Sequence, residues 1–243
     1  MPEHEPWLTA LFNDHLAGLA NAALALFGQK TMERPWSTSL SMEIVVAIII
    51  VVLFAVLKAR LSMDRPGKLQ QTFEVIYNFL HEQSEANAGH DGPKYLALFG
   101  SIFIFVLFCN LIGIIPTFES PTMFPEVPAG LALVVFCYYN LMGMIAQGPG
   151  RYLAHFAGPF WWMAPLMIPI EIVSHLARPL SLTIRLFANM YAGERVTGVF
   201  LGLTYLIAPA VFMGLHVFVA FLQAYIFALM TMMYVGNAVA HEH

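Results

Sequence analysis

The sequence has 243 residues, of which 59% are hydrophobic and only 11% are charged, and its formal net charge at pH 7 is −4. Soluble globular domains carry about a quarter charged residues, so this chain lacks the charge that a water-facing surface needs. The composition predicts a protein that crosses the membrane several times, and it offers no basic surface for nucleic acid. Cys109 and Cys137 lie inside apolar runs, which predicts buried free thiols rather than a disulfide framework.

Residues 1–39 precede the first long apolar run and are expected to form an N-terminal segment beside a single membrane domain of residues 40–243. Within this segment several apolar side chains follow helical spacing. This spacing predicts an interfacial helix on the outer surface of the membrane. The residues concerned are Trp7, Leu8, Leu11, Phe12 and Leu19.

A helix that crosses the hydrocarbon core needs about 20 mostly apolar residues. Three runs of this kind lie at residues 40–57, 95–115 and 127–146. The apolar segments 161–192 and 209–238 predict further crossings. We therefore expect an all-α polytopic membrane protein with about five membrane-crossing helices.

The run from residue 196 to residue 240 contains no Asp, Glu, Lys or Arg. As one continuous helix it would extend about 65 Å, roughly twice the thickness of the hydrocarbon core. The chain must therefore break or tilt strongly. Pro209 predicts the break, because proline is tolerated best in the first turn of a helix. The helix after the break still exceeds one perpendicular crossing, which predicts a strong tilt.

Positive side chains gather in alternate loops, which sets the expected orientation. The loop of residues 116–128 has two glutamates, no Lys or Arg and several prolines, and we interpret it as a stiff outer connection. The other connections are basic, so the N-terminus is expected outside and the C-terminus inside. The basic residues of the inner side are Lys58, Arg60, Arg65, Lys68, Lys94 and Arg151.

Two further patterns predict contacts with the membrane surface. Between residues 68 and 82 the apolar side chains follow helical spacing, which predicts an amphipathic helix on the inner surface. Tyr152, together with Trp161 and Trp162, is typical of an interfacial aromatic belt.

The segment 161–192 carries ionisable residues that an apolar helix should not contain, since each costs about 2.5–3.5 kcal/mol on insertion scales. On a helical wheel these polar residues form one stripe, with an apolar face opposite. His216 and Gln223 likewise share one face of the last helix. One interpretation is structural pairing, of Glu171 with Arg178 or of His216 with Glu194. The other is a path for protons or ions. The residues of the stripe are Glu171, His175, Arg178, Arg185 and Asn189, with Ser174 at its edge.

The run of residues 179–194, PLSLTIRLFANMYAGE, resembles the signature of subunit a of the F-type ATP synthase, in its bacterial form. The resemblance extends upstream to EIVS at 171–174 and downstream to His216 with Gln223. It also includes NLIGIIP at 110–116. Together these motifs cover the chain from about residue 40 onward.

The resemblance implies a stator subunit of the F0 sector, in the plasma (inner) membrane of a bacterium. Its partners would be a rotating ring of c subunits, subunit b of the peripheral stalk and the rest of the ATP synthase. The last two long helices would form a steeply tilted hairpin against the ring. Proton flow through two offset half-channels would drive rotation and hence ATP synthesis. The subunit is not itself an enzyme and needs no cofactor beyond the transported H⁺.

The resemblance also implies roles for single residues. Arg185 matches the essential arginine, which separates the half-channels and meets the carboxylate of the ring. The positions of the outer half-channel are Asn110, Asn189, Glu194, His216 and Gln223, and those of the inner half-channel are Glu171, Ser174, Arg178 and Ser181. Some bacterial members have an acidic residue at the position of Gly113, and His175 matches no assigned position.

Other function classes leave different traces in a sequence. A secondary transporter could bind an anionic substrate with Glu171, Arg178 and Arg185, but transporters often show broken helices in two related halves, and here the polar residues lie in one half. A structural membrane scaffold would not need the stripe. No phosphate-binding loop of the GxxxxGK[ST] type occurs, so no nucleotide site is expected on this chain.

Overall fold

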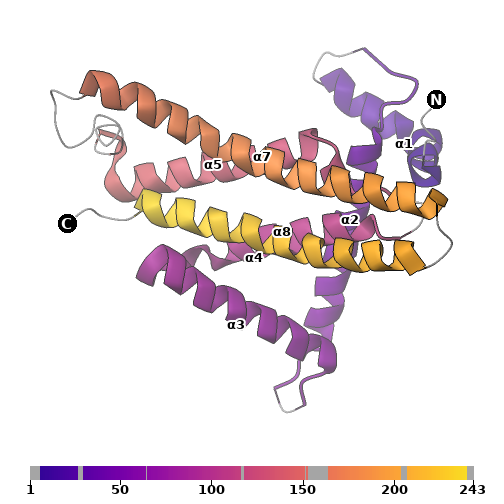
Figure 1. Ribbon diagram of the computed structural model, residues 1–243, viewed down its shortest axis with the longest axis horizontal. Coiled ribbons are helices and arrows are strands. Elements are labelled where there is room, and N and C mark those ends of the chain that lie inside the picture. Colours follow the sequence, from indigo (N-terminus) through magenta and orange to yellow (C-terminus); the bar gives the residue numbers. More distant parts are fainter. Residues whose placement is uncertain are drawn as a thin grey trace.

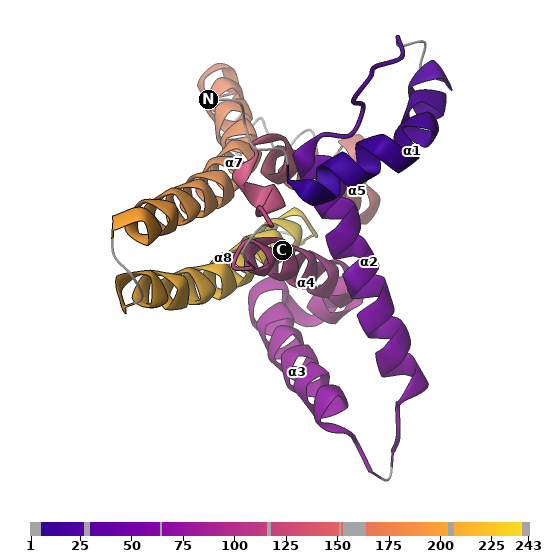
Figure 2. The ribbon, with the colours of Figure 1, turned by 90° about the vertical axis from the view of Figure 1, so that its right-hand side faces the viewer.

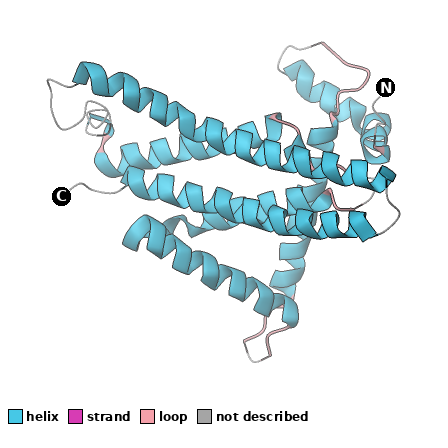
Figure 3. Ribbon diagram, viewed as in Figure 1, coloured by secondary structure: helices cyan, strands magenta, loops and turns pink. Residues whose placement is uncertain are grey.

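The computed structural model describes residues 6–26, 30–63, 65–115, 118–150, 152, 164–203 and 207–239. Every regular element within these ranges is a helix (Figure 3). Four helical segments among the described residues are long and apolar enough to cross a membrane: Thr38–Ala59, Gly92–Ile112, Glu126–Gln147 and Ala210–Val239. The predicted crossing at 161–192 is not one of these four. The chain is therefore an all-α polytopic membrane protein, as the composition predicts. Its helices are α1 Trp7–Leu26, α2 Thr38–Ala59, α3 Lys68–Ala88, the short η1 Gly89–Tyr95, α4 Leu96–Ile112, the short η2 Pro121–Met123, α5 Glu126–Gln147, α7 Ala164–Leu203 and α8 Ile207–Val239.

The helix bounds agree with the sequence-based spans except at the end of α7. This helix does not stop near residue 192 but continues to Leu203. The charged Glu194 and Arg195 do not end it, because a helix is broken by loss of backbone hydrogen bonds rather than by charge. The expected break before Pro209 is confirmed, since α8 begins at Ile207.

The helices α4, α5, α7 and α8 run alongside one another, and α2 crosses their common direction (Figures 1 and 2). At 1.5 Å per residue, the 40 residues of α7 extend about 60 Å and the 33 of α8 about 50 Å. Both lengths exceed the roughly 30 Å hydrocarbon core. Such helices fit a bilayer only when strongly tilted, as the excess length in the sequence predicts.

One apolar core joins these four helices. Leu182, Leu186 and Met190 repeat every four residues, so they lie on one face of α7, and all three are buried. On α8 the facing residues include Ala224 and Ala228, whose small side chains allow the helices to approach closely.

The segment before α2 folds back on α1. The side chain of Asn13 donates to the carbonyl of Trp36 (3.1 Å) and accepts from its amide (3.0 Å), and the Trp36 indole donates to the Leu16 carbonyl (3.0 Å). The ring of Trp7 meets Phe118 edge-on at 6.2 Å. Helix α1 is therefore attached near the loop that follows α4.

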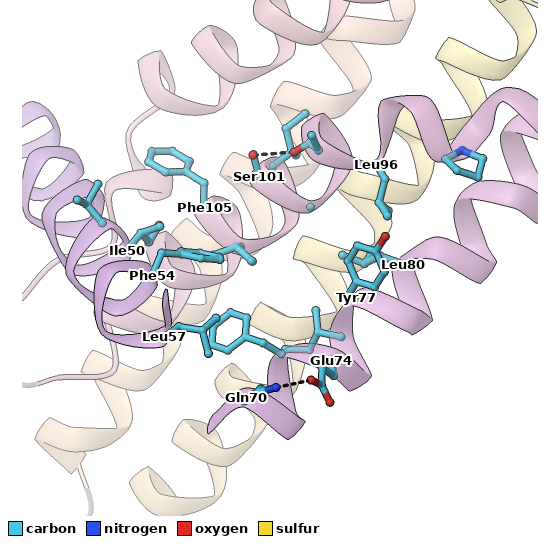
Figure 4. A pocket seen from close by; sticks show the side chains of 18 of the residues that line it. Ile50, Phe54, Leu57, Gln70, Glu74, Tyr77, Leu80, Leu96, Ser101 and Phe105 are labelled. Atoms are coloured by element: carbon cyan, nitrogen blue, oxygen red, sulfur yellow. Dashed lines mark hydrogen bonds between the residues drawn. The ribbon is translucent and has the colours of Figure 1, made fainter. Parts of the chain in front are cut away.

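Helix α3 lies beside α8 and diverges from α2, with which it encloses an apolar groove (Figures 1 and 4). The hydroxyl of Tyr225 on α8 donates to Gln83 on α3 over 3.1 Å. The groove has a volume of about 1130 Å³. Its walls come from α2, α3 and α4, among them Phe54, Leu57, Tyr77, Leu80 and Leu96.

The two cysteines differ in burial. Cys109 is buried and Cys137 is exposed, and both are free thiols. The expectation of a buried thiol is thus wrong for Cys137. It shares the outward face of α5 with Leu133, Val134 and Leu141, which are exposed.

Candidate ion-translocation site

Arg185 lies halfway along α7, half-buried between the core residues Leu182 and Leu186. Within the described ranges its guanidinium group makes no hydrogen bond or ion pair. Arginine stays protonated in proteins, so this helix carries a permanent positive charge that no neighbouring carboxylate within the described chain neutralises.

One turn beyond Arg185, a polar contact joins α7 to α8. The side-chain amide of Asn189 donates to Oε1 of Gln223 over 2.8 Å. Gln223 is only 2% exposed, whereas Asn189 is exposed. This pair therefore connects the buried contact between α7 and α8 to the protein surface.

A chain of hydrogen bonds runs from α4 through the η2 loop to α7. Thr122 donates from Oγ1 to Oδ1 of Asn110 (2.6 Å), and its hydroxyl is 2.7 Å from that of Ser120. The backbone amide of Ser120 donates to Glu194 (2.9 Å). Asn110 also donates to the carbonyl of Ala220 on α8 (3.4 Å). Two of the predicted outer positions, Asn110 and Glu194, thus belong to one connected polar network. His216 lies one helical turn before Ala220, whose carbonyl Asn110 contacts.

Two glycines make room for the ionisable side chains of this network. A Cβ at Gly193 would lie 2.8 Å from Nδ1 of His216, and one at Gly113 would overlap the Glu194 carboxylate. In this chain Gly113 therefore leaves space for Glu194 rather than contributing an acid of its own.

His216 is 7% exposed, and within the described ranges its Nε2 has no hydrogen-bond partner. Buried polar groups nearly always have a partner, so this nitrogen is an unusual feature of the protein interior.

Neither structural pair suggested by the sequence forms among the described residues. Glu171 makes no ion pair with Arg178, and Glu194 bonds the Ser120 amide rather than His216. The structural-pairing interpretation of the stripe is therefore wrong for these residues. Glu194 and His216 are neighbours through Gly193 without a direct bond.

Ser120 and Thr122 were missed by the sequence analysis, which treated residues 116–128 as a stiff connection only. Both side chains are fully buried, and the Ser120 hydroxyl also donates to the Cys109 carbonyl (2.8 Å). The signal in the sequence is weak. It consists of two small hydroxyl residues, one on each side of Pro121.

The predicted inner residues occupy the first half of α7. Glu171 and Arg178 are half-buried, whereas Ser174 and Ser181 are exposed. The guanidinium carbon of Arg178 stands 5.5 Å from the centre of the Tyr234 ring on α8, within cation–π range. Within the described part of α7 no hydrogen bond connects these four side chains to one another, so they form a row along the helix rather than a bonded cluster.

His175 and Tyr152 depart from their expected places. His175 turns from the stripe toward α5 and is 8% exposed. Tyr152 is also 8% exposed, and its hydroxyl donates to Asn140 over 2.8 Å. Its assignment to an interfacial belt is therefore wrong, because a belt residue would present its hydroxyl to the membrane surface. Trp161 and Trp162 lie outside the described residues.

The outward faces of α7 and α8 are strongly apolar. Large hydrophobic side chains cover both helices, with Ser181 and Asn189 exposed among them. The helix pair thus presents a broad apolar surface, which on α7 lies largely opposite the polar stripe that includes Arg185. Its exposed members include Val173, Leu176, Leu180, Ile184, Val199, Val211, Leu215 and Phe218.

Comparison with known proteins identifies the family. A family model described as ATP synthase A chain matches residues 39–236. ATP synthase subunit a of Solibacter usitatus (strain Ellin6076) is 67% identical over 233 residues, which are 96% of this chain and 100% of the relative. Subunit a of Koribacter versatilis (strain Ellin345) is 44% identical over 242 residues, 99% of either chain. Subunit a of Nitratidesulfovibrio vulgaris (strain DP4) is 46% identical over 183 residues, 73% of this chain and 76% of the relative. The match runs from α2 to α8 and includes every site residue described above, and so the chain belongs to the ATP synthase A chain family.

Proposed function

We propose that this chain conducts protons between two offset half-channels and the rotating c-ring of an ATP synthase, with Arg185 as the barrier between them. Membership of the family supports the broader statement that the chain is a proton-translocating membrane subunit of the F0 sector. The observation that carries the finer proposal is Arg185 itself, a half-buried cation that has no partner among the described residues.

The position of Arg185 along α7 suits a barrier. It lies four residues before Asn189 and seven after Arg178, about 6 Å and 10 Å along the helix axis at 1.5 Å per residue. The outer half-channel would use the side chains of Asn189, Gln223, Glu194, His216 and Asn110. To these we add Ser120 and Thr122, which hydrogen-bond to Glu194 and Asn110.

The inner half-channel would follow the row of Glu171, Ser174, Arg178 and Ser181. Ser174 and Ser181 are exposed and Glu171 and Arg178 are half-buried, so the row can meet water on one side and the c-ring on the other.

A carboxylate on the c-ring supplies the moving charge. Facing lipid it must be neutral, because a bare charge in hydrocarbon is too costly. Opposite Arg185 its ionised form is favoured, so it releases its proton to one half-channel. The fixed positive charge also blocks direct hopping, and each charge that crosses the membrane carries about 2.3 kcal/mol per 100 mV.

The partners are assigned to two different surfaces. The c-ring would pack on the side of α7 and α8 where Arg185 lies. The membrane helix of subunit b would occupy the groove between α2, α3 and α4, whose walls are largely apolar. Nucleotide chemistry would belong to other subunits of the complex, so this chain is proposed to be non-catalytic and to need no cofactor.

The basic loop between α2 and α3 sets the proposed orientation. Lys58, Arg60, Arg65 and Lys68 would face the cytoplasm, with the N-terminus outside and the C-terminus inside the bacterial plasma membrane. Because α4, α5, α7 and α8 share one core, residues 40–243 are proposed to act as a single domain, with α1 on its outer side.

Thiol labelling tests the two-channel geometry. In a background without Cys109 and Cys137, cysteines at Ser174 and Ser181 are expected to react with small aqueous reagents added on the inner side. Only thiolates react readily, and a thiol facing lipid is neither ionised nor wetted.

Cysteines at Asn189 and Gln223 are expected to react from the outer side only. Gln223 is buried but bonds the exposed Asn189, whereas Leu186 belongs to the apolar core and Phe200 stacks on Phe212 at 4.2 Å. Cysteines at Leu186 and Phe200 therefore serve as unreactive controls. Reaction of all four polar positions from the same side would indicate one continuous pore and favour the transporter alternative.

A further inference from the structure

A closed polar cluster lies between α5, Tyr152 and α7, outside both proposed half-channels. Nε2 of His175 is 2.8 Å from Oδ1 of Asn140 and 3.2 Å from the hydroxyl of Tyr139. The Tyr152 hydroxyl donates to the same Asn140 oxygen over 2.8 Å. Tyr139 is 1% exposed, and His175 and Tyr152 are each 8% exposed. Three separate parts of the chain therefore meet at one amide oxygen.

The bonding pattern places a hydrogen on Nε2 of the histidine. The Asn140 amide group donates to the Phe136 carbonyl (2.7 Å), so its Oδ1 points to His175 and Tyr152. An amide oxygen only accepts, and Nε2 of His175 must therefore carry the hydrogen. The rings of Phe136 and Tyr139 both pack on the imidazole, with centroids 5.2 Å away at 65° and 72°.

Gly143 leaves the space that the Tyr152 ring occupies in this cluster. A Cβ at Gly143 would lie 2.5 Å from Cε2 of Tyr152 and 3.1 Å from the Ala238 carbonyl. Only glycine leaves room for the Tyr152 ring at this place on α5. By contrast, a Cβ at Gly130, on the same helix, would meet nothing within 4 Å.

The cluster connects to Arg178 through aromatic rings. The Tyr139 ring that packs on His175 also lies 5.9 Å from the Tyr234 ring of α8, over which Arg178 stands. Helix α7 is weakened here, because Pro179 has no N–H to donate to the His175 carbonyl four residues earlier.

We propose that His175 is a positioning residue of the inner half-channel: with Nε2 donating to Asn140, it anchors the turn of α7 that holds Arg178 over Tyr234. The inference rests on the proposed function, which assigns Arg178 to the inner half-channel. His175 does not itself carry the transported proton in this arrangement. It acts by fixing the position of the Arg178 side chain.

The test uses the complete ATP synthase in lipid vesicles, with ATP-driven proton pumping per assembled complex as the readout. His175→Leu is expected to lower the rate about tenfold, the size of effect that loss of one buried hydrogen bond produces. His175→Gln is expected to restore most of the rate, because its amide nitrogen can donate to Asn140. Equal losses in the two variants would show that the bond is irrelevant and would overturn the proposal.

A double-mutant cycle separates positioning from a general structural role. If His175 acts through Arg178, then His175→Leu causes no further loss in an Arg178→Ala background. Multiplicative losses would overturn the inference while leaving the half-channel proposal intact. A wild-type rate in Arg178→Ala alone would remove Arg178 from the proton path, and with it both the inner half-channel assignment and the anchor.

Variants at Gly143 and Tyr152 test the same cluster if the complex that carries His175→Leu does not assemble. Gly143→Ala is expected to displace Tyr152 and slow pumping severalfold, whereas Gly130→Ala leaves the rate unchanged. Tyr152→Phe removes only one of the two donors to Asn140 and is expected to give a smaller loss than Gly143→Ala. Wild-type pumping in Gly143→Ala would contradict the anchor.

Discussion

At the scale of single residues, Arg185 is the group on which the proposed mechanism depends. Arg185→Ala is expected to abolish coupled proton transport and ATP synthesis while the chain still inserts and assembles, because the residue is only half-buried and its charge has no partner within the described chain. Arg185→Lys is expected to fail almost as completely. A compact ammonium can lose its proton when desolvated, and it lacks the planar fork of a guanidinium. Proton-driven ATP synthesis in vesicles measures both variants, and near-normal synthesis with lysine would refute the need for a permanent charge.

Glu194 and His216 provide a second test at this scale. They are not bonded to each other, but Gly193 lies against the His216 ring and precedes Glu194, so both side chains would belong to the proposed outer half-channel. If one proton path uses both, the losses in Glu194→Gln and His216→Ala should be strongly non-additive in the double variant. Rates of ATP-driven proton pumping in the wild type, the two single variants and the double variant complete this double-mutant cycle. Losses that simply multiply would mean that the two side chains act independently.

At the scale of elements, the short helix η2 links α4 to α7. Thr122→Val keeps the shape of the side chain but removes the hydroxyl that bonds Asn110 and Ser120. An unsatisfied buried polar group costs about 1–3 kcal/mol, so proton uptake from the outer side should slow roughly five- to a hundredfold. The matched control is Thr72→Val on α3, whose exposed hydroxyl bonds only Lys68 within its own helix. An unchanged rate in Thr122→Val would exclude η2 from the proton path.

At the scale of the whole molecule, the end of α8 is fixed against α3. A Cβ at Gly236 would lie 2.8 Å from both Cα of Ala88 and the Asn87 carbonyl, which are backbone atoms that cannot move alone. Gly236→Ala should therefore destabilise the protein by about 1–3 kcal/mol through overpacking.

Thermal unfolding of the purified complex in detergent measures this effect. Gly214→Ala, on the same helix with nothing within 4 Å of its Cβ, should leave the midpoint unchanged or raise it, because alanine favours helix by about 1 kcal/mol over glycine. A lower midpoint in both variants would mean that α8 tolerates no added methyl group anywhere, and close contact with α3 would not be the cause.

The sequence by itself determined the membrane class, the helix positions and the location of Arg185, because hydrophobic runs and helical spacing are local properties of the chain. It also predicted the break before α8, since proline acts on its own backbone. The hydrophobic span did not predict that α7 continues to Leu203, because the charged Glu194 and Arg195 end the apolar run without ending the helix.

Only the tertiary structure decided which polar groups meet. Ser120 and Thr122 joined Asn110 and Glu194 because a proline-rich loop folds between α4 and α7, and no periodicity describes such a loop. The side chain of His175 bonds Asn140, a residue 35 positions away, although the helical wheel placed it in the polar stripe of α7. Hydrogen bonds between distant segments depend on how helices pack, and that is a property of the whole fold rather than of any stretch of sequence.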